Sequence, residues 1–415
     1  MTAQEHEPLD AGALRGDFPI LSRTIDEDTP LIYLDNAATS QTPARVIEAM
    51  SQYYREYNAN VHRGIHQLSM EASIEYEEAH DRLADFVGAE GREEIIFTKN
   101  TTEAINLVAF AWGIEELGPE DAVVLTEMEH HASLLPWQRV AEKTGAEVRY
   151  IPIDETGQLD LDAAADVIDA DAAVVSVAHV SNTLGTVNPV ADLAALAHEH
   201  GALLIADGAQ AVPNRPVDVK ALEVDFYAFS GHKMAGPTGI GVLYGKRDLL
   251  ESMDPFMVGG GMIEKVTFEG ATWADLPWKF EPGTPPIAEA VGLAEAADYL
   301  DAIGIERIQA HEGGITHYAH ERLRERGDVE VYGPPPGTDR TGLLSFNLEG
   351  VHAHDLSSIL NEQGIAVRAG DHCTQPLHDT LGVPASTRAS FYLYNTTEEV
   401  DALLEGLDVA KELFA

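Results

Sequence analysis

The sequence predicts an α/β fold: a mainly parallel, doubly wound sheet in a large domain, followed by a smaller α+β domain. From about residue 90 to 245, short apolar runs alternate with stretches whose apolar residues recur at helical spacing. After about residue 290, two long helical stretches and several short strands replace that alternation. With 415 residues, 45% of them hydrophobic, the chain is long enough for a sizeable core and two domains.

The large domain is expected to carry seven strands. The apolar runs that predict them are 94–98, 122–127, 147–153, 172–179, 202–207, 224–230 and 239–245. The amphipathic stretches 101–114, 133–144 and 190–201 predict helices between them. Alternation of strand and helix is typical of a parallel sheet with helices on both faces.

The small domain begins with two predicted helices, 287–304 and 305–326. Strands are expected at 329–333, 342–350, 365–370 and 388–394, with helices at 353–364 and 397–413. We therefore predict a large domain over residues 31–290 and a small C-terminal domain over 291–415. The N-terminal segment, residues 1–30, is expected to pack on the small domain and so to be part of it.

Charge and cysteine content limit the classes of function. The formal net charge is −44, with acidic residues spread between apolar positions, which predicts a folded, salt-adapted protein. Activity and folding in molar potassium chloride would separate this from an ordinary acidic enzyme. Such a surface repels nucleic acid and anionic membranes. The single cysteine and the absence of a signal peptide or an apolar run near 18 residues favour a reducing, cytoplasmic location.

Polar motifs follow the predicted strands at one edge of the sheet. In open α/β sheets, ligands bind at the carboxyl ends of the strands. Ordinary loop residues are the alternative, but five clusters at one edge make it less favoured. The residues are Thr101, Thr102, His130, His131, Asn182, Asp207, Gln210, Ser230, His232 and Lys233.

Lysine is scarce in this chain, so Lys233 in "FSGHKMAGPTGIG" is expected to have a specific role. A lysine in a tight, partly buried turn is a candidate Schiff-base former, which suggests pyridoxal 5'-phosphate. Asp207 is placed to pair with a pyridine nitrogen, and His130 to stack on the ring. Thr101 and Thr102 at a helix start suit a phosphate. Helix capping by Asp207 and by the Thr-Thr-Glu sequence remains an alternative.

Three further groups of residues have less specific patterns. His62, Arg63 and His66 form a local cationic patch, which suits an anionic ligand or a surface turn. Arg388 could hold a substrate carboxylate, or an acidic surface partner. A metal site is the rival interpretation for the histidines around Cys373, but there is one thiol and no C-x-x-C or H-E-x-x-H motif, so we predict no metal. The histidines concerned are His352, His354, His372 and His378.

The stretches "DGAQAV", "MEHHASLLPWQ", "HVSNTLGTVNP", "FSGHKMAGPTGIG" and "VRAGDHC" resemble the cysteine desulfurases of the class V aminotransferase fold. The resemblance runs through almost the whole chain. Within the family it is closest to the group II, SUF-system type, which is itself similar to the selenocysteine lyases. It implies the pyridoxal-phosphate fold type I, a homodimer, L-cysteine as substrate and a persulfide acceptor protein of the SUF system.

The resemblance also implies a role for each matching residue. Lys233 would carry the cofactor and move the Cα proton, while His130 stacks on the ring and Cys373 is the nucleophile that receives sulfur. Asp207 would pair with the ring nitrogen and Gln210 with the phenolic oxygen. The remaining roles are phosphate binding by Thr102, Ser230 and His232 with Thr101 close by, phosphate contact across the dimer by Thr284, and substrate binding by Asn182, Arg388, Arg368 and His62.

One residue departs from that pattern, and other functions remain open. Asp371 stands where group II proteins more often have a histidine or a small residue, and its charge opposes a thiolate at Cys373. A buried, inert cysteine is the structural alternative. The leading prediction is a desulfurase supplying sulfur for iron–sulfur clusters, with stimulation by an acceptor or strong reductant. Selenocysteine lyase, another β-lyase, a transaminase and a non-enzymatic scaffold are the alternatives.

Overall fold

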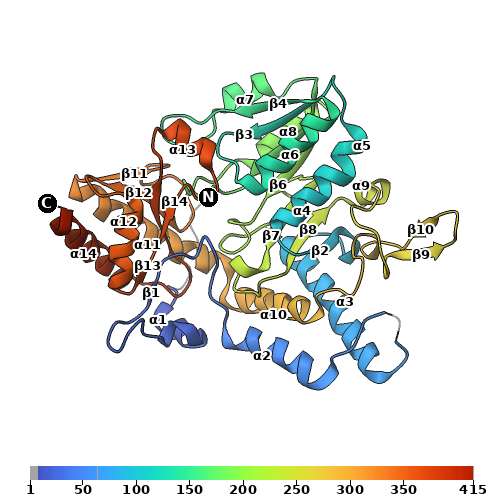
Figure 1. Cartoon of the computed structure of the whole chain (residues 1–415), viewed down its shortest axis with the longest axis horizontal. Helices are drawn as coiled ribbons and strands as arrows, with labels where there is room; N and C mark the ends of the chain where they lie inside the picture. The colour runs from blue at the N-terminus through green and yellow to red at the C-terminus, as the bar shows by residue number, and fades with distance from the viewer. Residues whose placement is uncertain (1–7, 63, 415) are drawn as a thin grey trace.

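A seven-stranded sheet forms the centre of the large domain (Figure 1) in this computed structural model, which describes residues 8–62 and 64–414. Across the sheet the strands are β2 (Ile95–Thr98), β8 (Gly241–Gly245), β7 (Phe226–Ser230), β6 (Leu203–Asp207), β5 (Ala172–Ala178), β3 (Ala122–Thr126) and β4 (Glu147–Ile151). Only β8 runs against its neighbours, and the other four pairs are parallel. The predicted mainly parallel sheet is confirmed.

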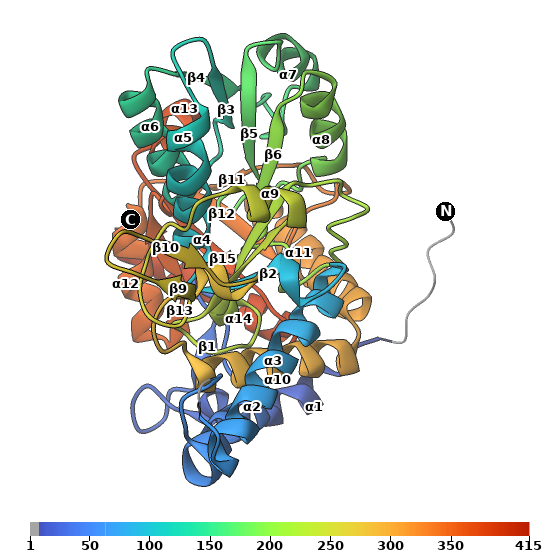
Figure 2. The same ribbon diagram turned by 90° about the vertical axis from the view of Figure 1, so that its right-hand side faces the viewer.

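Helices cover both faces of this sheet. In Figure 2, α5 and α6 lie on one side of β3, β5 and β6, and α7 and α8 lie on the other. Successive residues of β3 alternate between two hydrophobic cores, since Val123 and Leu125 belong to one and Val124 to the other. Burial on both faces explains why these strands read as continuous apolar runs.

The helices of the large domain fill the intervals between its strands and the flanks of the sheet. They are α2 (Ala44–Gln52), α3 (Gln67–Val87), α4 (Thr101–Val108), α5 (Ile114–Glu116), α6 (His131–Thr144), α7 (Leu161–Val167), α8 (Val190–Glu199) and α9 (Arg247–Ser252). A π-helical turn, Ala109–Gly113, continues α4 into α5. The predicted helix 101–114 is therefore one apolar stretch in three consecutive helical pieces.

The direction of chain progression reverses between β3 and β5. The chain passes from β3 outward to β4 at the sheet edge, and then returns to place β5 on the other side of β3. Loops after β3 and β5 therefore diverge at their carboxyl ends, which leaves a crevice at this point. The loops after β6 and β7 lie beside it.

The smaller sheet is antiparallel, in the order β11 (Val329–Tyr332), β12 (Leu343–Leu348), β15 (Ser386–Ser390), β14 (Arg368–Gly370). Its core is shared with long helices (Figure 1). The helices of this part of the chain are α10 (Ile287–Ile303), α11 (Ile305–Arg326), α12 (Ala353–Glu362), α13 (Gln375–Leu381) and α14 (Thr397–Phe414). The smaller α+β unit predicted from the change in pattern is confirmed as part of the fold class.

The chain before residue 35 contacts the small sheet's side of the molecule. Arg15 forms an ion pair of 2.7 Å with Glu399 of α14, and β1 (Ile32–Tyr33) pairs with β13 (Ile365–Ala366). The short helix α1 (Ala11–Leu14) lies in this segment. At the other boundary, residue 290 falls inside α10, which packs against α2 and α3. The exact domain limits, 30/31 and 290/291, stay predictions.

The helices α2, α3, α7 and α9 were not predicted, and three further differences from the sequence expectation concern strands. The predicted strand 365–370 is two strands, because β13 pairs with β1 while β14 pairs with β15. The predicted strand 388–394 ends at Ser390. A hairpin of β9 (Ile263–Val266) and β10 (Ala271–Trp273) was not expected, since its strands are short and mostly exposed. Among the described residues, no helix is both long and apolar enough to cross a membrane.

Candidate active site

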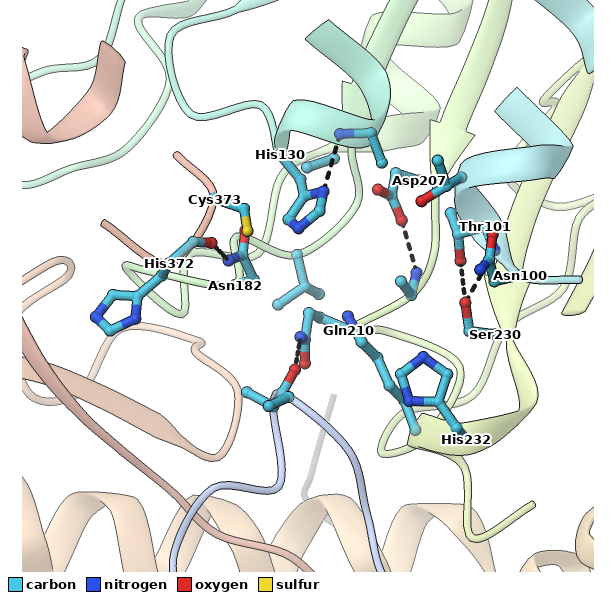
Figure 3. Close-up of a pocket in the computed structure, with 18 of the residues that line it drawn as sticks. Asn100, Thr101, His130, Asn182, Asp207, Gln210, Ser230, His232, His372 and Cys373 are labelled. Carbon is cyan, nitrogen blue, oxygen red and sulfur yellow. Dashed lines mark hydrogen bonds between the residues drawn. The ribbon is translucent and has the colours of Figure 1, made fainter. Parts of the chain in front are cut away.

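A cavity of about 190 Å³ lies at the carboxyl ends of the parallel strands, beside the loops that diverge after β3 and β5 (Figure 3). Fourteen residues were predicted for the site, and twelve of them line this cavity. They are Thr101, Thr102, His130, Asn182, Asp207, Gln210, Ser230, His232, Lys233, Arg368, Cys373 and Arg388. These residues span more than 280 positions of sequence, so the fold is what brings them together.

Lys233 ends a short 3₁₀ turn, Gly231–Lys233, directly after β7. The turn is fixed from both sides: the carbonyl of His232 accepts from Thr39 Oγ1 at 2.9 Å, and Gly236 N donates to Gly231 O at 3.0 Å. Protein surrounds the amine except where it meets the cavity. This burial lowers the pKa of Lys233 to about 8, although nearby Asp207 opposes the shift. About a tenth of the amine is therefore neutral at about pH 7, and the neutral fraction rises through about pH 8.

Asp207 and His130 face this lysine from β6 and from the start of α6. Asp207 Oδ1 accepts from Ala209 N at 2.9 Å, and burial raises the pKa of this carboxyl while Lys233 lowers it. His130 Nδ1 accepts from Ala132 N at 3.0 Å, which caps α6 and leaves the ring proton on Nε2. Burial and the nearby Lys233 charge lower the pKa of His130 to about 3, so its ring is neutral.

The start of α4 closes the opposite end of the cavity. Thr101 N donates to Ser230 Oγ at 2.9 Å, and the Thr101 and Ser230 hydroxyls lie 2.7 Å apart. Asn100 Oδ1 caps the helix by accepting from Glu103 N. A Cβ on Gly241 would lie 2.5 Å from Asn100 Cα, so glycine permits this close approach of β8. Helix amides and hydroxyls together favour an anion here.

Two arginines border the cavity from adjacent strands. The register of β14 and β15 places Arg368 directly opposite Arg388. Arg388 is buried; its Nη1 donates to Asn182 O at 2.8 Å, and its Nη2 lies 3.3 Å from Asp35 Oδ1. Its Nε–H has no partner among the described residues, so a donor remains for a ligand. A carboxylate entering the cavity would meet both guanidinium groups.

Two predicted side chains make contacts that the sequence does not indicate. Gln210 Nε2 donates to Ala37 O at 2.7 Å, which fixes its amide orientation at the cavity wall. Asn182 Nδ2 donates to His372 O at 2.7 Å, so this amide holds the loop that carries Cys373. Cys373 itself is half-buried and lines the cavity.

His62 and Thr284 are the two predicted residues outside this cavity. Both line a second hollow of about 240 Å³, beside Trp278 and Glu281. The His62 ring packs on Trp278, with ring centroids 4.3 Å apart. Arg63, which the sequence placed in the same cationic patch, lies outside the described residues.

The histidines that a metal might use are dispersed in the structure. His352 and His354 stack on each other at the start of α12, whereas His372 and His378 both contact the Ser386 hydroxyl at 3.0 Å. No group of three or more His, Cys, Asp or Glu side chains in the described ranges is arranged to hold a metal ion.

Three residues near the site were not predicted from the sequence. Asp35, in the stretch "YLDNAAT", pairs with Arg388. Asn100 could have been recognised as the residue that caps the Thr-Thr-Glu helix start. Glu129, next to His130, is buried; its Oε1 accepts from Thr126 Oγ1 and Ala178 N, and burial raises the pKa of its carboxyl to about 8. No sequence pattern indicates that this acid is buried.

The family model for class-V aminotransferases matches residues 32–403. The chain belongs to the class-V aminotransferase family. Family membership confirms the resemblance drawn from the motifs, and with it the pyridoxal-phosphate-dependent fold. Family membership also confirms the predicted cofactor, pyridoxal 5'-phosphate.

Two relatives and two solved structures show how close the match is. The cysteine desulfurase of Haloferax volcanii is 64% identical, and the probable cysteine desulfurase of Halobacterium salinarum is 65% identical; each alignment covers 100% of both chains. The apo cysteine desulfurase of Thermococcus onnurineus is 43% identical, with a TM-score of 0.92 and 99% of both chains covered. The cysteine desulfurase CsdA of Escherichia coli, in an S-sulfonic acid form, is 38% identical with a TM-score of 0.91 over 99% and 100% of the two chains.

The cavity of this class-V chain fits pyridoxal 5'-phosphate. An amine of lowered pKa, a buried carboxylate and a neutral imidazole surround one space, and an anion-binding helix start lies at its end. Lys233, Asp207 and His130 would hold the ring, while Thr101 and Ser230 would be at the phosphate end. These are the donor types that the group requires.

The Lys233 pKa predicts how cofactor uptake depends on pH. Only the neutral amine can bond to the cofactor's aldehyde carbon, and with a pKa of about 8 its neutral fraction rises with pH. We expect the uptake rate of cofactor-free protein to increase about tenfold between about pH 7 and about pH 9. Stopped-flow absorbance in molar potassium chloride would measure it. A flat profile over this range would contradict a titrating Lys233.

Proposed function

We propose that this chain converts L-cysteine to L-alanine, with the substrate sulfur transferred to Cys373 as a persulfide. The observation that carries the proposal is the composition of one cavity, which is lined by Lys233, Asp207, Arg388 and Cys373 together. A transaminase would have no need of a thiol in this cavity. The desulfurase relatives described above support the same activity.

Substrate binding would begin with the carboxylate. Two cationic side chains line one wall of the cavity: Arg388 on β15 and Arg368 directly opposite it on β14. The Nε–H of Arg388 has no partner among the described residues. Asp35 keeps the buried Arg388 oriented, since it binds Nη2 on the other edge. Fixing the carboxylate at this wall would aim the substrate's Cα at the interior of the cavity.

Proton transfer would be the work of Lys233. Its neutral amine can accept the Cα proton, and the resulting ammonium can return a proton to the product. Bound pyridoxal phosphate supplies an electron sink for the pair left at Cα, which its pairing with the Asp207 carboxylate would strengthen. The neutral His130 ring would pack against the cofactor without competing for the Cα proton, because its pKa lies near 3.

Sulfur transfer would form one bond and break one. The Cys373 sulfur attacks the substrate sulfur, so an S–S bond forms while the substrate C–S bond breaks and its electron pair passes to carbon. The carbon takes up a proton to become alanine, and the enzyme is left with a persulfide. No outside oxidant is needed. Release of that sulfur requires a reductant or an acceptor thiol.

A homodimer would complete the site. His62 and Thr284 share a hollow outside their own chain's cavity, so they could act only on the cavity of a second copy. Large apolar side chains are exposed on the segments beside this hollow, and association would bury them. They are Ile65, Met257, Val258 and Phe268.

We infer that the persulfide passes to an acceptor protein of the SUF type for iron–sulfur cluster assembly, in the cytoplasm. The Cys373 segment is short and fixed, because Asp371, Asn182 and His131 all bond its backbone. A persulfide held there cannot travel, so a partner or a small reductant must come to it. Stimulation of turnover by such an acceptor is the consequence.

Product analysis tests the proposed function. Wild-type protein in molar potassium chloride with dithiothreitol should release alanine and sulfide from L-cysteine in a one-to-one ratio. Parallel assays with L-selenocysteine measure the preference between sulfur and selenium. A much higher rate with selenocysteine would make the selenocysteine lyase alternative the better description, and absence of alanine from both substrates would contradict the proposal.

A further inference from the structure

The backbone that carries Cys373 has an unusual conformation. His372 and Cys373 have φ angles of 51° and 61°, so two consecutive non-glycine residues lie in the left-handed region. Side chains with a Cβ disfavour this region, and such residues persist only where surrounding contacts hold them. The position of the Cys373 sulfur therefore depends on what fixes this turn.

Three backbone groups of the turn have separate anchors. His131 N donates to Cys373 O at 2.8 Å, and Asn182 Nδ2 donates to His372 O at 2.7 Å. Both of these anchors hold carbonyls from outside the loop. The Cys373 N–H is held from within it, by Asp371 Oδ1 at 3.1 Å.

Asp371 also contacts Thr374, the residue that precedes helix α13. Its backbone carbonyl accepts from Thr374 N at 2.8 Å and from Thr374 Oγ1 at 2.9 Å. The Thr374 hydroxyl in turn lies 2.8 Å from Thr183 Oγ1 of the large domain. A carboxylate that bonds the amide two residues later forms an Asx turn, and aspartate and asparagine are suited to this geometry. Asp371 thus closes the turn from within the loop.

We propose that Asp371 is a positioning residue for the nucleophile: its carboxylate oxygen holds the Cys373 amide, and this hydrogen bond aims the sulfur into the cavity. The proposal rests on the proposed function of Cys373 and adds a residue to it. The position matters because sulfur attack requires a fixed distance and direction. The negative charge of Asp371 has no part in this role, since an amide oxygen accepts the same hydrogen bond.

The matched variants Asp371→Asn and Asp371→Ala separate the hydrogen bond from the charge. Both remove the same charge, so any electrostatic effect on the thiol is common to both, but only the asparagine variant keeps an acceptor oxygen. We expect alanine formation from L-cysteine to be at least tenfold slower in the alanine variant than in the asparagine variant. The loss should appear in kcat, with KM within about twofold, because Arg388 and Arg368 are untouched.

A second measurement does not depend on turnover. Cys373 is the only cysteine of the chain, so iodoacetamide labelling of the substrate-free holoenzyme followed by mass spectrometry reports this thiol alone. We expect the labelling rate of the alanine variant to differ at least threefold from that of the asparagine variant at each pH tested. Asp379→Ala, at an exposed acid in α13, is the control and should match wild type in both assays.

The outcomes are distinct. Equal kcat and equal labelling for Asp371→Asn and Asp371→Ala would overturn the proposal, because the hydrogen bond would then have no effect beyond the charge. A difference in labelling with no alanine formed by wild type would support the positioning of the thiol while the proposed desulfurase function fails. Thermal unfolding and cofactor absorbance of both variants should equal those of wild type; cofactor loss specific to Asp371→Ala would also overturn the positioning role.

Discussion

Replacing Cys373 by alanine should abolish sulfur transfer while leaving the cofactor bound. The cysteine sulfur has no hydrogen bond among the described residues, whereas its backbone N–H and C=O are both anchored. Alanine keeps those backbone contacts and the Cβ, so the left-handed turn should persist. Loss of the nucleophile should lower alanine and sulfide formation from L-cysteine by at least about 10³-fold. Product assays beside the cofactor's visible absorbance would measure both effects.

The Cys373→Ser variant is the control for size. Serine fills nearly the same volume and keeps a polar atom, but its oxygen cannot form a persulfide. We expect it to be as inactive as the alanine variant and to show the same visible absorbance of bound cofactor. If Cys373→Ala still formed alanine and sulfide at the wild-type rate, Cys373 would be only a packed thiol, and the lyase and transaminase alternatives would replace the desulfurase.

The sheet and its site edge were predictable because they follow from short-range patterns. Runs such as 122–125 and 172–175 are apolar throughout, since both faces of these strands are buried. Once alternation of strand and helix establishes a parallel sheet, the residues after each strand must meet at one edge. This is why His130, Asn182, Asp207 and Lys233 could be expected together without any knowledge of contacts.

The details of the site could not be predicted in the same way. Asn182 was expected to bind substrate, yet its side-chain amide holds the His372 carbonyl across 190 positions of sequence. The pairing of Asp35 with Arg388 likewise joins the two ends of the chain. These contacts join residues that are far apart in sequence, so no local sequence pattern predicts them.

Three other features depend on backbone conformation, on strand pairing or on the proposed homodimer. The left-handed φ of Cys373 is not indicated by a glycine or asparagine at that position, and hydrogen bonds from His131, Asn182 and Asp371 hold the turn. Likewise, strand 365–370 divides because its two halves meet different partners, β1 and β15. His62 and Thr284 lie in a hollow separate from the cavity, and they would reach a cofactor site only in the proposed homodimer.

Substitution of Lys233 by alanine should remove the proton-transfer step altogether. Among the described residues Lys233 is the only lysine that lines the cavity, and its lowered pKa of about 8 suits a group that must both accept and return a proton. The other titratable groups nearby are less suited: His130 has a pKa near 3 and Asp207 is expected to pair with the cofactor. We therefore expect at least about a 10³-fold loss of alanine formation, even with excess cofactor added.

Exchange of the Cα proton separates this role from sulfur transfer. In deuterium oxide, wild type and Cys373→Ala should both replace the Cα hydrogen of L-alanine with deuterium, as measured by proton NMR. Neither the removal of the Cα proton nor the return of a deuteron needs the thiol. Lys233→Ala should show no exchange, and Lys143→Ala, at an exposed lysine of α6, should behave as wild type. Exchange by Lys233→Ala at the wild-type rate would mean that another group moves the proton. Exchange without desulfuration in Cys373→Ala would assign the two residues to two successive steps in one cavity, with Lys233 acting on carbon and Cys373 on sulfur.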